Sequence, residues 1–291
     1  MLDIPKLLRI LNISQKELDH LLENIDKYYY VISTPKMSKK TGLQLIDKNG
    51  KLRTRDLYPS VGLLKTVQQR IYHQLLKTIK LPSYAFGGIQ KRDNILNSKM
   101  HQGNKFFFNT DLRNFYPGIT HKQVFEMFLT NHFSPTVAQI LTKLTTFKGM
   151  LPQGTPTSPY LANLVFVSAG KELVLLAQHH SLTFTTFVDD ITISSKTDFK
   201  PLVNAFFEII ISNGFKISHD KTFYQTKLPK VTNVIVKNNG IYLADAYKDK
   251  IEGFEDKETL TAKGTINYYN RVHKISKTKT TRIKEKVYQK A

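Results

Sequence analysis

Apolar side chains three or four residues apart recur along this chain and predict several short helices. In the first helical region, residues 6–29, Ser14 and Glu17 form a capping-box pattern that predicts the start of a second helix. A later helix is predicted to end at Gly214, because glycine readily adopts the backbone conformation that closes a helix. The remaining helical patterns cover residues 60–79 opening at Ser60, a short segment that leads to His101 after a glycine-rich loop, 121–147 with a break at Ser134 and Pro135, and 200–213.

Other short runs are rich in β-branched and aromatic residues and predict strands. Two of them, residues 183–188 and 191–194, flank the adjacent acidic residues Asp189 and Asp190, so this acidic step is predicted to be a tight hairpin turn. An Asn49-Gly50 step between two basic clusters predicts a second hairpin. Further strands are predicted over residues 28–32, 105–111, 230–236 and 240–243.

The acidic hairpin is the first candidate for chemistry. Two carboxylates at one turn, with no basic side chain beside them, repel each other unless a cation lies there. Mg²⁺ and similar hard cations take oxygen ligands, so Asp189 and Asp190 are candidate metal ligands. An inert, solvated Asp-Asp turn is the competing interpretation.

Two further segments favour the metal interpretation. The predicted strand 105–111 ends in a carboxylate, Asp111. Residues 151–159 (Leu-Pro-Gln-Gly-Thr-Pro-Thr-Ser-Pro) form a loop that opens into a helical run. In this order, the strand-end Asp, the Gln-Gly loop and the Asp-Asp hairpin resemble the polymerase palm of reverse transcriptases, specifically the bacterial retron-type branch.

Shorter strings add to this resemblance. Residues 187–190 (Phe-Val-Asp-Asp) correspond to the family's Tyr-x-Asp-Asp motif, with Phe187 in place of the usual Tyr. Residues 97–101 (Asn-Ser-Lys-Met-His) resemble the Asn-Ala-x-x-His signature of retron enzymes, although no chemical role is predicted for His101. Residues 231–233 (Val-Thr-Asn) stand where retrons commonly show Val-Thr-Gly, and residues 264–269 resemble the start of a thumb helix.

The resemblance implies an α+β fold, the right-hand polymerase fold with fingers, an antiparallel palm sheet backed by helices, and a short helical thumb. Its expected boundaries are 1–104 for the fingers and N-terminal helices, 105–236 for the palm with a fingers insertion around 121–155, and 237–291 for the thumb and a basic C-terminal helix. The tail from Arg271 onward is rich in Lys and Arg. It is either a solvated helix or a basic helix that lies on a duplex backbone.

The resemblance also implies a two-metal mechanism of nucleotidyl transfer. Asp111 and Asp189 would bind two Mg²⁺ ions, with Mn²⁺ as an alternative metal. Asp190 would assist, and the Leu112 carbonyl would complete one coordination shell. Lys221 matches a lysine that protonates the departing pyrophosphate, and a surface lysine is the competing interpretation.

Nucleotide-binding residues follow from the same resemblance. Tyr116 is expected to exclude ribonucleotides by contact with the sugar, and a core aromatic is the alternative. Gln153 and Gly154 are expected near the incoming nucleotide and the template base. Arg55 resembles the fingers arginine that grips the triphosphate, and Lys51 and Arg53 are the other candidates for that role.

Composition agrees with a polyanionic partner. The chain has 291 residues with 43 Lys and Arg against 23 Asp and Glu, a net charge of +20. Such a charge suits nucleic acid, although a membrane surface or a ribosome would also attract it. Cysteine is absent, which excludes disulfides and thiolate chemistry. Apolar stretches such as 204–211 are too short for a bilayer and the N-terminus lacks a signal-peptide pattern, so a cytoplasmic protein is expected.

The expected function is therefore RNA-directed DNA synthesis, in a retron that makes an RNA–DNA hybrid for anti-phage defence. The expected partners are a structured non-coding RNA template, its DNA product, dNTPs and a defence effector protein, without a membrane. The alternatives are a non-retron defence-associated reverse transcriptase with different priming, a catalytically idle polymerase scaffold, and a merely basic RNA-binding protein.

Overall fold

The computed structural model describes residues 2–38, 42–47 and 49–283, and the chain forms two compact units. Unit 1 comprises Met1–Lys80 and Asn114–Val165, and unit 2 comprises Leu81–Arg113 and Phe166–Ala291. Both units combine helices with antiparallel strands, so the predicted α+β fold class is confirmed.

Unit 1 begins with two short helices, α1 (Ile4–Leu11) and α2 (Gln15–Glu23). The predicted capping box is present: the Ser14 hydroxyl accepts a hydrogen bond from the Glu17 N–H at 3.2 Å, and the Glu17 carboxylate accepts one from the Ser14 N–H at 2.8 Å. The hydrogen bonds that the Ser14 N–H and the Ser14 hydroxyl donate to the Glu17 carboxylate lower the pKa of this carboxyl. Leucines of both helices are buried, so one face of each helix packs into the core of the unit.

A hairpin follows, formed by β1 (Ile32–Pro35) and β2 (Thr54–Leu57). The prediction of a turn at Asn49-Gly50 is confirmed, because the Gly50 N–H donates to the Asp47 carbonyl at 3.1 Å and Gly50 has a φ of +78°. The predicted strand over 28–32 was wrong. The 3₁₀ turn η1 (Ile25–Tyr28) ends at the first of these residues, Tyr29 forms only an isolated bridge with Ser60, and β1 begins at the last of them, Ile32.

The next helix, α3 (Gly62–Arg70), continues through a π-helical turn, η2 (Ile71–Leu75), and a 3₁₀ turn, η3 (Leu76–Thr78). Ser60 does not open this helix as predicted. Its buried hydroxyl instead donates to Oε1 of the buried Gln68 at 2.6 Å. The later helices of the unit are α5 (Phe115–Gly118), α6 (His121–Thr130) and α7 (Pro135–Thr145), so the predicted break at Ser134 and Pro135 is confirmed.

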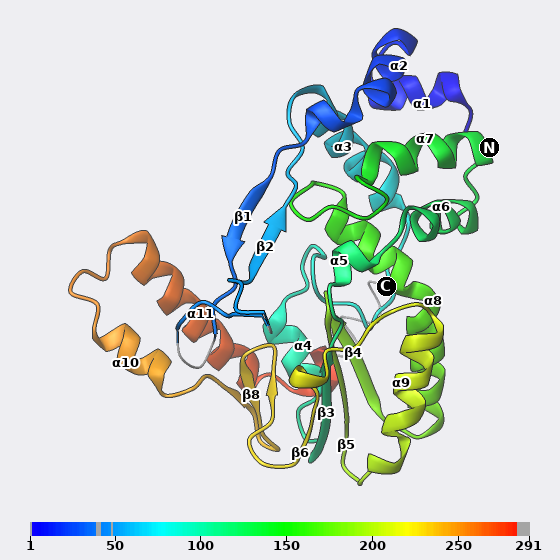
Figure 1. Cartoon of the computed structure of the whole chain (residues 1–291). Coiled ribbons are helices and arrows are strands. Elements are labelled where there is room, and N and C mark those ends of the chain that lie inside the picture. The colour runs from blue at the N-terminus through cyan, green and yellow to red at the C-terminus, as the bar shows by residue number, and fades with distance from the viewer. Residues whose placement is uncertain (1, 39–41, 48, 284–291) are drawn as a thin grey trace. The chain divides into compact units, whose positions relative to one another are not determined.

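Unit 2 is built on a four-stranded antiparallel sheet with the strand order β4-β5-β3-β6. Alternate residues of β3 face opposite sides of the sheet: Phe108 contacts Phe206 on one side, and Phe107 joins an apolar cluster on the other. Figure 1 shows α9 lying along one side of this sheet. The bounds are β3 (Phe106–Asp111), β4 (Thr183–Phe187), β5 (Asp190–Ser195), β6 (Phe223–Gln225) and α9 (Val203–Ser212), with the 3₁₀ turns η4 (Lys200–Leu202) and η5 (His219–Lys221).

The opposite side of the sheet packs on a second layer of short elements. Ile95, Phe107, Val231 and Val272 meet there in one buried cluster. Residues 230–236 are two strands and not the single strand predicted, because Thr232 and Asn233 adopt left-handed φ values of 45° and 70° and turn the chain back. The layer contains α4 (Asn94–Met100), β7 (Lys230–Val231), β8 (Val234–Val236), β9 (Ile241–Tyr242) and α11 (Leu260–Lys277), and α10 (Ala246–Glu252) packs on α11.

Helix α11 begins before the predicted thumb-helix start at Gly264 and ends at Lys277. Arg271, at the start of the predicted basic tail, forms an ion pair with Asp93 instead of projecting as a purely solvated charge. Ile283 packs on the buried Phe86 and Met100. The rest of the predicted C-terminal helix, residues 284–291, lies outside the described residues.

Helix α8 (Ser158–His179) is the longest in the part of the chain that the structure describes. Its length of 22 residues and its composition would suffice to cross a bilayer, which the apolar stretches singled out in the sequence would not. However, 61% of its most apolar window is buried inside the structure. Protein packing therefore accounts for its apolar composition, as in the core helices of soluble proteins.

Candidate metal centre

Three carboxylates of unit 2 converge at one end of the four-stranded sheet. Asp111 ends β3, and Asp190, which begins β5, is its direct partner across the strands. Asp189 precedes Asp190, and its carbonyl accepts a hydrogen bond from the Leu112 N–H at 2.9 Å. One oxygen of each carboxylate lies within 4.8 Å of the other two. The prediction that these three carboxylates, distant in sequence, lie close together is confirmed.

The hairpin between β4 and β5 differs in detail from the prediction. Its loop consists of Val188 and Asp189, whereas Asp190 already belongs to the strand and pairs with Phe187. Val188 has a φ of +59°, which is strained for a β-branched residue. This strained residue lies directly before Asp189. Strained backbone conformations are often found at functional sites.

Gly87 supports this strained turn, a role that the sequence did not indicate. The preceding segment pairs with β4, since the Phe86 N–H donates to the Thr186 carbonyl at 2.8 Å. A Cβ atom on Gly87 would lie 2.4 Å from the Val188 nitrogen and 2.9 Å from the Phe187 carbonyl carbon. Only glycine therefore fits against the turn as it stands. The glycine-rich loop was visible in the sequence, but its contact with residue 188 was not.

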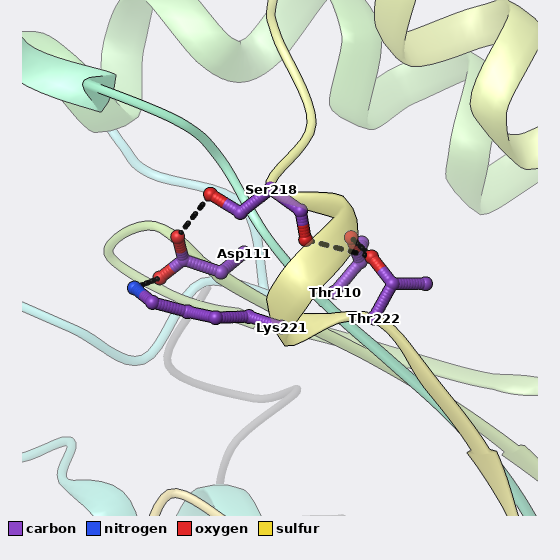
Figure 2. A network of polar contacts seen from close by, with 5 residues as sticks. All are labelled: Thr110, Asp111, Ser218, Lys221 and Thr222. Carbon is purple, nitrogen blue, oxygen red and sulfur yellow. Dashed lines mark hydrogen bonds and ion pairs between the residues drawn. The ribbon is translucent and has the colours of Figure 1, made fainter. Parts of the chain in front are cut away.

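Both carboxylate oxygens of Asp111 are engaged, as Figure 2 shows. The Ser218 hydroxyl donates to Oδ1 at 2.8 Å, and the Lys221 ammonium donates to Oδ2 at 2.8 Å. Asp111 is 7% exposed, so these contacts fix a carboxylate that is largely shielded from water. The sequence singled out Lys221 but assigned no role to Ser218, although both belong to the same short string.

The turn that carries Lys221 is tied to the sheet by further hydrogen bonds. The Ser218 N–H donates to the Asp111 carbonyl at 2.8 Å. The Thr222 hydroxyl donates to the Ser218 carbonyl at 3.0 Å and lies 2.8 Å from the Thr110 hydroxyl. Lys221 is therefore presented from a backbone whose position is fixed relative to Asp111.

The donor set fits a hard divalent cation. Carboxylate oxygens are the ligands that Mg²⁺ and Mn²⁺ prefer. Three carboxylates within 4.8 Å of one another concentrate negative charge, which a divalent cation would balance. The Leu112 backbone passes beside the cluster, as its hydrogen bond to Asp189 requires.

The residues predicted to bind nucleotide lie in unit 1. Tyr116 is half-buried in α5 beside Phe115, with ring centroids 5.7 Å apart. The Gln153 carbonyl accepts a hydrogen bond from the Tyr58 N–H at 2.7 Å. Gly154 has a φ of +102°, so glycine is the residue suited to this loop.

The three basic candidates for the triphosphate also lie in unit 1, exposed on the hairpin. Arg55 is in β2, opposite Thr34 of β1. The Arg53 N–H donates to the Leu45 carbonyl, and the Lys51 N–H donates to Oδ1 of Asp47. Their roles towards the carboxylates of unit 2, like those of Tyr116 and Gln153, stay predictions.

His101 bridges the two strands that carry the acidic hairpin. Its Nδ1 lies 2.6 Å from the Ser194 hydroxyl, and its Nε2 lies 2.7 Å from the Thr185 hydroxyl. All three residues are buried. These contacts tie the buried imidazole to both strands.

The two retron-like strings contact each other. The Ser98 hydroxyl donates to the Val231 carbonyl at 2.8 Å, and the Asn97 amide lies 3.5 Å from the Thr232 hydroxyl. Asn233, which replaces the usual glycine, has a φ of 70°. Because Asn tolerates this left-handed conformation better than most residues, the substitution preserves the turn.

An antiparallel sheet that gathers carboxylates for divalent cations is typical of a metal-dependent nucleotidyl-transfer centre. Comparison with known families agrees: the family described as reverse transcriptase (RNA-dependent DNA polymerase) matches residues 37–265. The chain belongs to this family.

Several curated relatives are retron enzymes. The chain is 32% identical over 213 residues to the retron Ec86 reverse transcriptase of Escherichia coli, which covers 70% of this chain and 66% of that protein. It is 30% identical over 198 residues to the retron Se72 reverse transcriptase of Salmonella heidelberg (strain 579083-10), which covers 67% and 48%. For the retron Ec48 reverse transcriptase of Escherichia coli the identity is 28% over 237 residues, covering 75% and 54%. The chain thus spans about half to two thirds of the length of these relatives.

Proposed function

We propose that this protein is an RNA-directed DNA polymerase that extends DNA on an RNA template by two-metal nucleotidyl transfer. The observation that carries this proposal is the convergence of Asp111, Asp189 and Asp190 within 4.8 Å in a chain of the reverse transcriptase family. The idle-scaffold alternative requires no such cluster.

In this mechanism Asp111 and Asp189 would hold two Mg²⁺ ions, with Mn²⁺ as an alternative, and Asp190 and the Leu112 carbonyl would assist. When bound, the metal ions activate the primer hydroxyl and neutralise the charge that develops on the triphosphate. Ser218 orients Asp111 through its hydrogen bond to Oδ1. Lys221 is positioned beside the same carboxylate and donates a proton to the departing pyrophosphate.

Unit 1 contributes nucleotide selection. Tyr116 excludes the ribose 2′-hydroxyl, and Gln153 with Gly154 lies near the incoming nucleotide and the template base. Arg55, Lys51 and Arg53 are the candidates for the triphosphate grip. In polymerase terms, residues 1–104 act as fingers and N-terminal helices, 105–236 as palm with a fingers insertion around 121–155, and 237–291 as thumb with a basic C-terminal segment.

The cellular context proposed here is a retron. The contact between the Asn97–His101 and Val231–Asn233 strings, together with the similarity to several retron enzymes, supports it. The template would be a structured non-coding RNA, the product an RNA–DNA hybrid in the cytoplasm, and the further partner a defence effector protein. The second candidate is a non-retron defence-associated enzyme. Sequencing the nucleic acid that co-purifies separates them: a branched RNA–DNA species supports the retron, and tandem-repeat or random DNA supports the alternative.

The catalytic proposal is tested by dNTP incorporation on an RNA template with a DNA primer. The wild-type protein should extend the primer only with Mg²⁺ or Mn²⁺. Asp189→Asn should reduce the rate by about 100- to 1,000-fold, the usual cost of removing one preorganised charge-stabilising group. Asp249→Asn, an exposed carboxylate of α10, is the matched control and should leave the rate unchanged. Full activity of Asp189→Asn, or no synthesis by the wild-type protein at any metal concentration, would reject the proposal.

A further inference from the structure

A second concave site lies in unit 2, away from the carboxylates. It is a cleft of about 410 Å³ whose lining includes Lys105, Lys196 and Lys237. Lys105 directly precedes β3, and Lys196 directly follows β5. Asp111 ends β3 and Asp190 begins β5, so the cleft occupies the opposite end of the sheet. Six strand residues at about 3.3 Å each separate the two ends by roughly 20 Å.

The lining of the cleft is cationic. It contains three lysines and neither Asp nor Glu. All three lysines are exposed, and among the ion pairs of the described residues none involves them. Three ammonium groups around one concavity repel each other, so an anion that enters the cleft relieves this repulsion.

Two of the ammonium groups are held over aromatic rings. Lys105 Nζ lies 5.4 Å from the centroid of the Phe106 ring, and Lys237 Nζ lies 5.2 Å from that of Tyr242. Such cation–π contacts restrict the side chains without neutralising their charge. Lys105 and Lys237 are thus partly ordered for binding.

The remaining lining favours a polynucleotide over a small phosphate. Leu228 is 61% exposed and adjoins Pro229, which gives the cleft an apolar wall beside its cations. A small-anion site is typically built from converging backbone N–H groups at a helix N-terminus or nest. Here the charge is carried by long, exposed side chains, as is typical of contacts to a nucleic-acid backbone.

We propose that this lysine cleft, defined by Lys105, Lys196 and Lys237, binds the phosphate backbone of the RNA at a point remote from the catalytic centre. The inference rests on the proposed function only in taking RNA as the ligand. A contact at this end of the sheet would hold the RNA independently of the primer terminus.

The test measures the salt dependence of RNA binding with a labelled RNA hairpin and no nucleotide. Replacing all three lysines by Gln should weaken binding and reduce the slope of log K against log salt by about 2, since each neutralised phosphate contributes roughly 0.7–0.9. The matched control replaces three exposed lysines outside the cleft, Lys16, Lys171 and Lys200, and should leave the slope nearly unchanged. Thermal melting establishes that each variant is folded, and Lys196→Gln alone, with a slope change of about 0.7–0.9, replaces the triple variant if that does not fold.

An unchanged slope in the cleft variant, or an equal change in the control variant, would overturn the inference. Binding of inorganic phosphate by the wild-type protein that is lost in the cleft variant, without any change in RNA binding, would also overturn it and indicate a small-anion site. Because the readout is binding, it is separate from catalysis: a protein that makes no DNA but shows the predicted slope change retains the cleft and rejects only the polymerase proposal.

Discussion

Asp111 illustrates how one residue links the fold to the chemistry. Its backbone carbonyl accepts a hydrogen bond from Ser218, and its carboxylate accepts one from the Ser218 hydroxyl and one from Lys221. A divalent cation that binds Oδ2 of Asp111 would therefore compete with the Lys221 ammonium for that oxygen. The Lys221 ammonium is a counterion of this carboxylate.

Removing this counterion should strengthen metal binding. The Lys221 side chain is 54% exposed, so the ion pair is partly screened by water. We expect Lys221→Met to tighten Mn²⁺ binding by about two- to fivefold, the range that exposed ion pairs support, while the rate of DNA synthesis falls. Titration followed by electron paramagnetic resonance measures the Mn²⁺ affinity. Lys216→Met, an exposed lysine of the same unit, controls for net charge, and weaker Mn²⁺ binding in Lys221→Met would contradict the competition.

Gly87 makes a second residue-scale prediction. Since a Cβ atom there would overlap Val188, Gly87→Ala should displace the turn that carries Asp189. We expect the turnover number to fall by about 100-fold, because displacements of about 1 Å at a reacting centre have such effects. Steady-state kinetics together with a melting curve measure this.

The matched control is Gly264→Ala, a helical position where an added Cβ meets nothing within 4 Å. It should keep its activity and gain slightly in stability, because Ala favours helix more than Gly. If Gly87→Ala were as active as Gly264→Ala, the contact with Val188 would not position Asp189.

At the scale of elements, α4 connects the acidic hairpin to the second layer of unit 2. His101 follows its last turn and bonds hydroxyls on both β4 and β5, while Asn94 and Ser98 bond residues 231–232. The string that resembles the retron signature therefore orders the elements around the site.

His101→Leu should accordingly lower stability more than chemistry. Thr185 would lose its side-chain partner in a buried position, whereas Ser194 would keep its hydrogen bond from Asn104 at 2.7 Å. We expect the free energy of unfolding to fall by about 1–3 kcal/mol, the usual cost of one unsatisfied buried polar group. Denaturant titration measures it, and the exposed His180→Leu should change stability by less than about 0.5 kcal/mol. Equal losses in the two variants would show that the bridge contributes little.

Local patterns predicted many of these elements and failed where distant residues decide. The capping box at Ser14 and the break at Pro135 depend on neighbours in sequence and were correct. Ser60 was wrongly predicted to open a helix because its partner, the buried Gln68, was not visible in the pattern. The two-strand form of residues 230–236 depends on left-handed backbone at Thr232 and Asn233, which neither residue type requires.

The candidate site followed the same rule. Asp111, Asp189 and Asp190 could be selected because each ends or begins a recognisable strand and because their order along the chain resembles a known family. Ser218 and Gly87 could not, since one acts through a hydrogen bond and the other through the space it leaves empty.

At the scale of the whole molecule, a strongly positive net charge is combined with a local cluster of carboxylates. The chain carries a net charge of +20, yet three carboxylates meet at one end of the sheet in unit 2 and three lysines line a cleft at the other. A cationic surface attracts a polyanion over its whole length, whereas an acidic cluster needs divalent cations before a triphosphate can approach it. Both properties are expected of an enzyme that acts on nucleic acid with bound metal.

The central claim is that Asp111, Asp189 and Asp190 together hold the metal ions of DNA synthesis. The most direct measurement is anomalous diffraction from crystals containing Mn²⁺, an RNA template with a DNA primer, and a non-hydrolysable dNTP. The account predicts two Mn²⁺ peaks about 4 Å apart, bonded to oxygens of Asp111 and Asp189, with the Lys221 ammonium no longer on Asp111. Mn²⁺ bound only elsewhere, with these carboxylates making no metal contact in a complex that extends primers in solution, would contradict it.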